Sequence, residues 1–244
     1  MRNATRVFFA AACAVGMLTH AARVEGGTLK IIAFGDSTTK ERAPQVKQVY
    51  AQTLAQELPR RGVEAEVINA GVPGNNTEDA RKRLEHDVLA QKPDLVIVQF
   101  GINDAAADVW RTPPETQPRI SREVYEQNLR ELVKKIRTGG ARIILMTPNP
   151  TRWSDITRKY YAKPPYKPDD PDGLNVFLRD YAEAARRVAR DEKVPLVDVY
   201  AAFEEHGKKP GATVDELLLD GMHPNDAGQK LVADLLIEKI TAPH

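Results

Sequence analysis

The most constraining feature of the sequence is a nearly continuous apolar run, Leu-Val-Ile-Val at residues 95–98. A strand with one face in water alternates apolar and polar residues, whereas this run has no polar face. Strands of this kind are covered on both sides, as they are in parallel sheets between two layers of helices. We therefore expect residues 94–100 to form a buried strand of a parallel sheet.

Patterns of strands and helices alternate along the rest of the chain. Apolar stretches predict further strands at 29–34, 63–69, 143–146 and 194–199, and helical spacing predicts helices at 42–58, 77–90 with Thr77 as its cap, 122–137, 174–191 and after the cap Asn225. This alternation predicts an α/β fold with right-handed crossovers. The loops that follow parallel strands meet at one edge of the sheet, where sites form.

The size and charge of the chain fit one compact domain. Of 244 residues, 42% are hydrophobic, which suits a substantial core over about residues 29–240. The formal net charge of +1 gives no field that would attract nucleic acid. Aromatic residues are sparse and are not interleaved with basic ones, so we expect no nucleic-acid partner.

Residues 1–21 have the features of a secretory signal peptide. Arg2 and Arg6 precede a short apolar run, and Thr19 and Ala21 place small residues at the −3 and −1 positions of a cleavage site. The run is shorter than the roughly 20 residues that span a bilayer, so we expect no stable membrane anchor. The sequence predicts cleavage near Ala21 and a secreted or periplasmic protein.

The single cysteine bears on lipid anchoring and on disulfide bonds. Cys13 lies inside the apolar run, whereas a lipid-modified cysteine follows such a run. We therefore expect no lipid anchor. A chain cleaved at Ala21 would contain no cysteine, so its core must be stable without disulfide bonds.

Two short motifs carry residues suited to acyl transfer. Ser37 follows the first predicted strand, where its backbone N–H would lie near the positive end of a helix. A serine in this place can equally be an ordinary helix cap. In the motif Asp220-x-x-His223 the carboxylate can accept the Nδ1 proton and leave Nε2 free to face a serine hydroxyl. The same motif also serves as a cap or a surface turn.

Two further loops follow the second and third predicted strands. Gly71 can be a turn glycine with positive φ, and Asn103 can cap a loop. The order of the motifs favours a shared site over these separate roles. The serine, the glycine and the asparagine follow strands one, two and three, and the Asp–His pair lies near the C-terminus.

This order of motifs resembles the GDSL or SGNH hydrolase family of serine esterases. The similar blocks are Phe34-Gly35-Asp36-Ser37, Asn69-Ala70-Gly71, Gly101-Ile102-Asn103-Asp104 and Asp220-x-x-His223. The resemblance extends from about residue 29 to 240. Thr38 replaces the leucine that is frequent in the family, which makes the first block similar to that of its carbohydrate acetylesterases.

The resemblance implies a flavodoxin-like, three-layer α/β/α sandwich around a parallel sheet of about five strands. It implies that Ser37 is the nucleophile, that His223 acts as general base and then as acid, and that Asp220 orients the imidazolium. The backbone N–H groups of Ser37 and Gly71, with the side-chain amide of Asn103, would form the oxyanion hole.

Neighbouring residues are expected to support this site. Gly74 and Asn75 would shape the pocket wall, and Asp36 and Asp104 would hold their loops through hydrogen bonds. The sequence contains no Cys/His cluster that offers a metal site, and the resemblance implies that neither a metal ion nor an organic cofactor is needed.

The function that we expect is a secreted esterase that removes small acyl groups, above all acetyl groups, from a carbohydrate. The substrate would be a small-molecule or polysaccharide ester. Loop 147–173 is aromatic and basic, which fits stacking on sugar rings. It equally fits a solvated insertion whose aromatic residues cover the domain edge.

Three other functions share parts of this pattern. A lysophospholipase or thioesterase would need an apolar acyl groove, and no markedly apolar loop is evident. A non-catalytic carbohydrate- or partner-binding module would be favoured by loss of Ser37 or His223, yet both are present. A flavodoxin-like cofactor binder is disfavoured because the first strand–helix turn lacks the glycine pattern that cradles phosphate.

Overall fold

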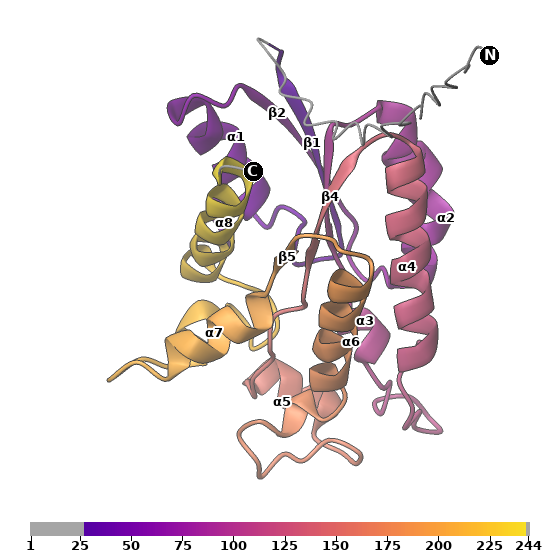
Figure 1. Ribbon diagram of the computed structural model, residues 1–244. Helices are drawn as coiled ribbons and strands as arrows, with labels where there is room; N and C mark the ends of the chain where they lie inside the picture. Colours follow the sequence, from indigo (N-terminus) through magenta and orange to yellow (C-terminus); the bar gives the residue numbers. More distant parts are fainter. Residues whose placement is uncertain (1–26, 243–244) are drawn as a thin grey trace, which may run out of the picture.

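The computed structural model describes residues 27–242, which form a five-stranded sheet between two layers of helices (Figure 1). The predicted signal peptide, with Cys13, lies outside the described residues. The strands are β1 (Leu29–Gly35), β2 (Ala65–Gly71), β3 (Leu95–Gln99), β4 (Arg142–Met146) and β5 (Leu196–Val197). Their order is β2-β1-β3-β4-β5, and every neighbouring pair is parallel. The expected α/β sandwich is therefore confirmed.

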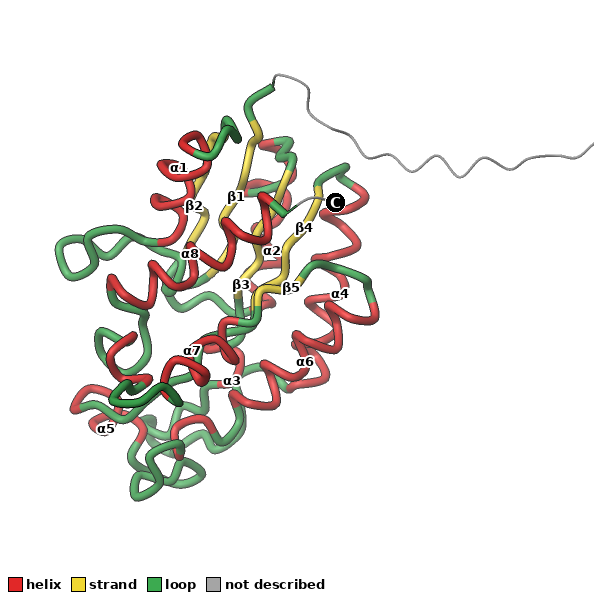
Figure 2. Tube along the Cα trace, turned by 60° about the vertical axis from the view of Figure 1, so that its left-hand side comes forward, coloured by secondary structure: helices red, strands yellow, loops and turns green. Residues whose placement is uncertain are grey.

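Helices pack on both faces of the sheet (Figure 2). One layer holds α1 (Tyr50–Arg60), α7 (Val199–Gly207) and α8 (Asp226–Thr241), and the other holds α2 (Thr77–Asp87), α4 (Arg122–Thr138) and α6 (Leu178–Asp191). The short helices α3 (Ile102–Ala105) and α5 (Asp155–Tyr161) follow β3 and β4. Single 3₁₀ turns lie at Leu89–Gln91, Gly173–Asn175 and Val214–Leu217.

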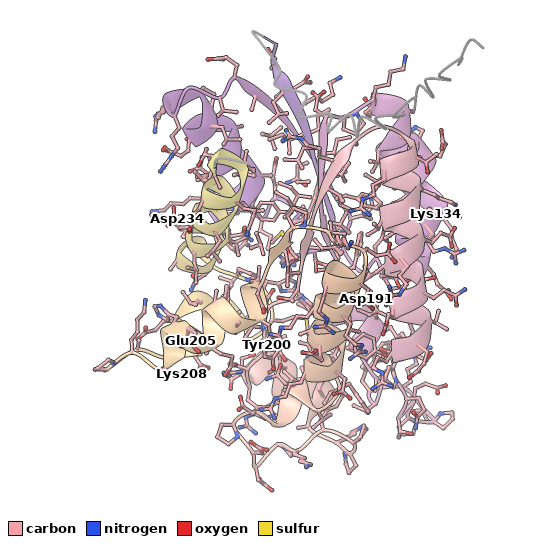
Figure 3. All side chains as sticks on the ribbon, in the orientation of Figure 1. Lys134, Asp191, Tyr200, Glu205, Lys208 and Asp234 are labelled. Atoms are coloured by element: carbon pink, nitrogen blue, oxygen red, sulfur yellow. The ribbon has the colours of Figure 1, made fainter. Side chains whose placement is uncertain are left out.

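Alternate residues of each central strand point into two separate cores. In β1, Phe34 packs against the α2–α4–α6 layer, whereas Ile31 packs against the α1–α8 layer. Both side chains are fully buried, and burial of one such side chain stabilises a fold by about 1.5–3 kcal/mol. Charged residues such as Lys134 and Asp234 lie on the outer faces of α4 and α8 (Figure 3).

Helix α1 is shorter than the sequence predicted, because it begins at Tyr50 and not near residue 42. Val46 and Val49 are buried, which explains their helical spacing, but they lie in the irregular segment that precedes the helix. The backbone N–H of Lys47 donates to Asp226 Oδ1 at 2.7 Å. That N–H is therefore engaged with α8 and not with a carbonyl group one turn earlier.

Other differences arise where side chains set the helix ends. Asn76, and not Thr77, caps α2, because its Oδ1 accepts from the backbone N–H groups of Glu78 and Asp79. Strand β5 has two residues because Asp198 already caps α7, a helix that the sequence pattern did not predict. Asn225 caps α8 as predicted.

Candidate active site

The strand order creates a switch point at the carboxyl end of the sheet. The chain passes from β1 to β2 on one side and then to β3 on the other side of β1. Doubly wound sheets bind their ligands at such a point. Ser37 follows β1 and Asn103 follows β3, so both lie at this switch point.

The structure brings Ser37, His223 and Asp220 together. Ser37 Oγ lies 3.0 Å from His223 Nε2, and His223 Nδ1 lies 2.8 Å from Asp220 Oδ2. Ser37 is 9% exposed, so little of the residue is open to solvent. This is the geometry in which an imidazole can take a proton from a serine while a carboxylate holds the ring.

Asp220 is held as a carboxylate. Burial opposes its ionisation, but hydrogen bonds and the charge of His223 outweigh burial and lower the pKa of Asp220 to about 2. Oδ1 accepts from the backbone N–H groups of Met222, at 3.1 Å, and His223, at 2.9 Å. The turn therefore fixes both the charge and the direction of this carboxylate.

The first part of loop 147–173 supports the Asp220–His223 turn. The backbone N–H of Arg152 donates to Gly221 O at 2.7 Å, and Ser154 Oγ donates to Asp220 O at 2.6 Å. Asn149 Nδ2 donates to Met222 O at 2.9 Å. This part of the loop thus anchors the turn along its backbone.

Gly221 permits this close approach, and we predict that Gly221→Ala destabilises the protein. Its φ is +82°, and a Cβ atom would lie 2.4 Å from Arg152 O. We expect a loss of about 2–3 kcal/mol in the free energy of unfolding, measured with denaturant, together with lower activity. The control is Gly211→Ala, with φ of +77° and open space around the new Cβ. It should cost about 1 kcal/mol and leave activity intact. Equal losses in the two variants would contradict this account.

The turn that carries Ser37 rests on a buried polar network. Thr38 Oγ1 lies 2.8 Å from Asp36 Oδ1 and 3.2 Å from Gln99 Oε1. From α8, Gln229 Nε2 donates to Thr38 O at 2.9 Å. Thr38 is 3% exposed, so it supports the turn from the protein interior and offers almost no surface to a substrate. Gln99 and Gln229 belong to no sequence motif, so the sequence did not predict their role in this network.

Gly71 does not join the site. Its backbone N–H donates to Asn69 Oδ1 at 2.9 Å, and a Cβ atom here would lie 2.6 Å from Lys40 N. Gly71 therefore allows β2 to pack closely against the turn after β1. The expectation that Gly71 donates to an oxyanion is at odds with this contact, and we do not retain it.

The next glycine in the same loop fits the donor role better. Gly74 has φ of +79°, and within the described part of the chain neither its N–H nor that of Ser37 has a hydrogen-bond acceptor. Asn103 Nδ2 donates to Asn75 O at 3.1 Å and to Asp36 Oδ2 at 3.3 Å. Asn103 thus joins the loop of Gly74 to the turn of Ser37. The Pro73-Gly74 pair was the signal in the sequence for this exposed turn.

Comparison with known proteins identifies the family of the chain. Residues 33–231 match the GDSL-like Lipase/Acylhydrolase family. The chain belongs to this family. It is 32% identical to an acetylxylan esterase of Geobacillus stearothermophilus over 179 residues, which are 71% of each chain. It is 31% identical over 218 residues to an uncharacterised lipoprotein of Bacillus subtilis, covering 83% of this chain and 85% of the relative.

Solved structures of GDSL-like acylhydrolases have the same fold. A lipase/acylhydrolase from Enterococcus faecalis superposes with a TM-score of 0.66 at 30% identity, covering 87% of this chain and 95% of that chain. The Geobacillus stearothermophilus acetylxylan esterase gives 0.68 at 27% identity, covering 89% and 96%. Three of its structures are described as catalytic mutants, with alanine replacing a serine, a histidine or an aspartate. This protein is a carboxylic ester hydrolase of the family.

Arg83 of this acylhydrolase holds the loop of Gly74, a role that the sequence pattern did not predict. Its guanidinium donates to Gly35 O at 2.7 Å, to Ala70 O at 2.9 Å and to Asn75 Oδ1 at 2.7 Å. It thus fastens the ends of β1 and β2 to the turn between β2 and α2. A planar guanidinium with several fixed donors suits this task better than an ammonium group does.

Asp36 and Asp104 hold their loops, as expected. Asp36 Oδ1 accepts from the backbone N–H of Thr38 at 2.8 Å, and Asp104 Oδ1 accepts from that of Thr77 at 2.9 Å. Burial raises the pKa of Asp104 to about 7, although hydrogen bonds from Thr77 oppose this shift. Because the pKa is raised from 3.8, Asp104 lowers the stability of the fold progressively as the pH rises from 3.8 to about 7.

The aromatic residues of loop 147–173 divide between packing and exposure. Tyr166 is buried, and its hydroxyl accepts from the backbone N–H of Ala107 at 2.8 Å. Tyr160 of the same loop is 43% exposed, and Trp110, in the loop between α3 and α4, is 46% exposed. Figure 1 shows α5 and its flanking loops at the end of the molecule where the strands finish. This end therefore carries both a small apolar core and exposed aromatic faces.

Over residues 27–242, no group of three or more His, Cys, Asp or Glu side chains is placed to hold a metal ion. None of the helices described for this stretch has the length and hydropathy of a membrane span.

Proposed function

We propose that this acylhydrolase cleaves esters through a covalent acyl-serine intermediate. The observation that carries the proposal is the unbroken series of contacts from Ser37 through His223 to Asp220, at 3.0 and 2.8 Å. Ser37 Oγ attacks the acyl carbonyl carbon while His223 Nε2 takes the hydroxyl proton. Asp220 accepts the Nδ1–H hydrogen bond and stabilises the imidazolium that forms.

The tetrahedral intermediate needs donors for its oxyanion. The candidates are the backbone N–H groups of Ser37 and Gly74 and one N–H of the Asn103 side chain, which would exchange its 3.3 Å contact with Asp36 Oδ2 for the oxyanion. Loss of one such donor costs about 2.7–4 kcal/mol of transition-state stabilisation. As the intermediate collapses, the C–O bond to the alcohol breaks and His223 returns the proton to the leaving oxygen. Water, deprotonated by the same imidazole, then attacks the acyl-serine and releases the acid.

The acyl group that we propose is small, and acetyl above all. An apolar recess at the carboxyl end of the sheet is lined in part by Ile102 and Met222, the chain neighbours of Asn103 and His223. The recess is narrow, with room for about one water-sized group. Tyr161, Leu174 and Leu178 are also among the residues that line it. A methyl group fits such a space, whereas a long acyl chain does not.

A carbohydrate ester is the substrate class that we propose, acted on outside the cytoplasm. The acetylxylan esterase that is 32% identical to this chain supports the carbohydrate part. In that enzyme the histidine and aspartate replaced in the catalytic mutants are three positions apart, as His223 and Asp220 are here. Trp110 and Tyr160 offer exposed aromatic faces for sugar rings. The predicted signal peptide supports secretion.

The substrate proposal predicts a steep preference for short acyl groups. With p-nitrophenyl esters, we expect kcat/KM to fall at least about tenfold from acetate to octanoate, because each excluded methylene forfeits the favourable burial that it would gain in a longer groove. The mature enzyme should also release acetate from at least one polysaccharide in a panel of acetylated xylans, mannans and pectins, with Ser37→Ala as the blank. An equal or rising rate with octanoate would favour the lipolytic alternative. Release from no polysaccharide would contradict the carbohydrate proposal.

A further inference from the structure

The amide of Asn103 is useful as an oxyanion donor only in one of its two orientations. An asparagine amide can rotate by 180° and exchange its oxygen and nitrogen with almost no change in shape. Nδ2 has two acceptors, Asn75 O and Asp36 Oδ2. Oδ1 accepts from Arg119 Nη1 at 3.3 Å. The orientation is therefore specified from both ends of the amide group.

Arg119 reaches Asn103 because Asp108 holds the rest of its guanidinium. Arg119 Nε and Nη2 donate to Asp108 Oδ1 at 3.0 and 2.6 Å. The Asp108 side chain is 3% exposed, so the carboxylate of this ion pair is buried. Since the guanidinium is planar and rigid, fixing two of its nitrogens on Asp108 also fixes the direction of the third.

The backbone brings this arginine beside α3. The N–H of Arg119 donates to Ala106 O at 2.9 Å, and the N–H of Ile120 donates to Asp104 O at 3.1 Å. These bonds close loop 107–118 at its base, next to the helix that carries Asn103. Arg111 also pairs with Asp108, at 3.0 Å, but it makes no hydrogen bond to Asn103.

We propose that Arg119 is a positioning residue that orients and polarises the oxyanion-hole amide of Asn103. This inference rests on the proposed function. A cation on Oδ1 disfavours the flipped amide, which would place an NH₂ group against the guanidinium. It also draws electron density toward the oxygen, which makes the N–H that exchanges Asp36 Oδ2 for the oxyanion a stronger donor. Asp108 sets the position of Arg119 and so acts one step further from the reaction.

Arg119→Met and Arg111→Met form a matched pair for the test. Both remove an arginine from Asp108, but only Arg119 contacts Asn103. With p-nitrophenyl acetate we expect Arg119→Met to lower kcat about 10- to 100-fold with KM changed less than about threefold, since the contact acts on the transition state. Arg111→Met should stay within about twofold of the parent in both constants. Arg119→Lys, which keeps the charge without the fork, should lie between the parent and Arg119→Met.

A double-mutant cycle with Asn103→Ala separates positioning from other roles. If Arg119 acts through Asn103, Arg119→Met should lower kcat by less than about twofold when it is introduced into the Asn103→Ala variant. An equal loss in both backgrounds, or a change in KM alone, would overturn the inference. If thermal unfolding shows that Arg119→Met is poorly folded, the same cycle is measured with Arg119→Lys, and its result decides whether the inference holds. Full activity of Arg119→Met beside an inactive Ser37→Ala overturns only the inference, whereas a parent no more active than Ser37→Ala overturns the proposed function as well.

Discussion

Replacing Ser37 with alanine should lower kcat for p-nitrophenyl acetate by about 10⁴- to 10⁶-fold, because the acyl group then has no nucleophile to receive it. The fold should survive, since among residues 27–242 the Ser37 hydroxyl is hydrogen-bonded to His223 alone. We therefore expect an unchanged circular dichroism spectrum and a melting temperature within a few degrees of the parent.

Ser121→Ala is the matched control for this variant. The Ser121 hydroxyl accepts from the backbone N–H of Val124 at 3.3 Å and caps α4, and it makes no hydrogen bond to Ser37, His223 or Asp220 among the described residues. Its loss should cost about 0.5–1 kcal/mol of stability and leave kcat unchanged. A Ser37→Ala protein that keeps parental turnover while folding normally would rule out Ser37 as the nucleophile.

Asp220→Asn should lower kcat by about 10⁴-fold. An amide can still accept the backbone N–H bonds from Met222 and His223, but it carries no charge to stabilise the imidazolium and does not select the tautomer with a proton on Nδ1. Asp226→Asn, a change of the same kind in the first turn of α8, should retain parental kcat, because Asp226 accepts from Lys47 N and has no bond to the imidazole. Similar activity of the two variants would contradict the role given to Asp220.

The pH dependence of stability follows from the same carboxylate. The pKa of Asp220 is about 2 in the folded protein against 3.8 for the ordinary group. A depressed pKa means that the stabilising effect is fully present above pH 3.8 and is lost as the pH falls through about 2. Asp220→Asn should therefore flatten the dependence of unfolding free energy on pH in this window, measured by denaturant unfolding at fixed ionic strength. Asp220 stays ionised at neutral pH and adds no inflection to the activity profile there.

Much of the fold could be predicted because burial alone determines it. The apolar run at 95–98 has no polar face, and it forms the central strand β3 between two layers of helices. The start of α1 could not be predicted from spacing, because Val46 and Val49 are buried in the irregular segment before the helix. Both belong to a core that also contains residues of the distant helix α8, which the local pattern does not reveal.

The residues of the candidate site could likewise be predicted only where their contacts are local in the sequence. Asp220 and His223 are close in sequence, so their motif already implies their contact. The choice between Gly71 and Gly74 depends on which backbone N–H is occupied, and that was decided by the side chain of Asn69. Arg83 and Arg119 contact residues in other loops, and a search for motifs gives no reason to single out either arginine.

The most direct test of the central claim is to label the nucleophile. An alkyl fluorophosphonate forms a stable phosphonyl ester with an activated serine, and intact-mass measurement followed by peptide mapping locates the label. We predict one phosphonyl group per chain, on the peptide that contains Ser37, appearing in parallel with the loss of esterase activity and absent from Ser37→Ala. Full activity with Ser37 labelled, or inactivation with the label on another residue, would contradict the acyl-serine mechanism.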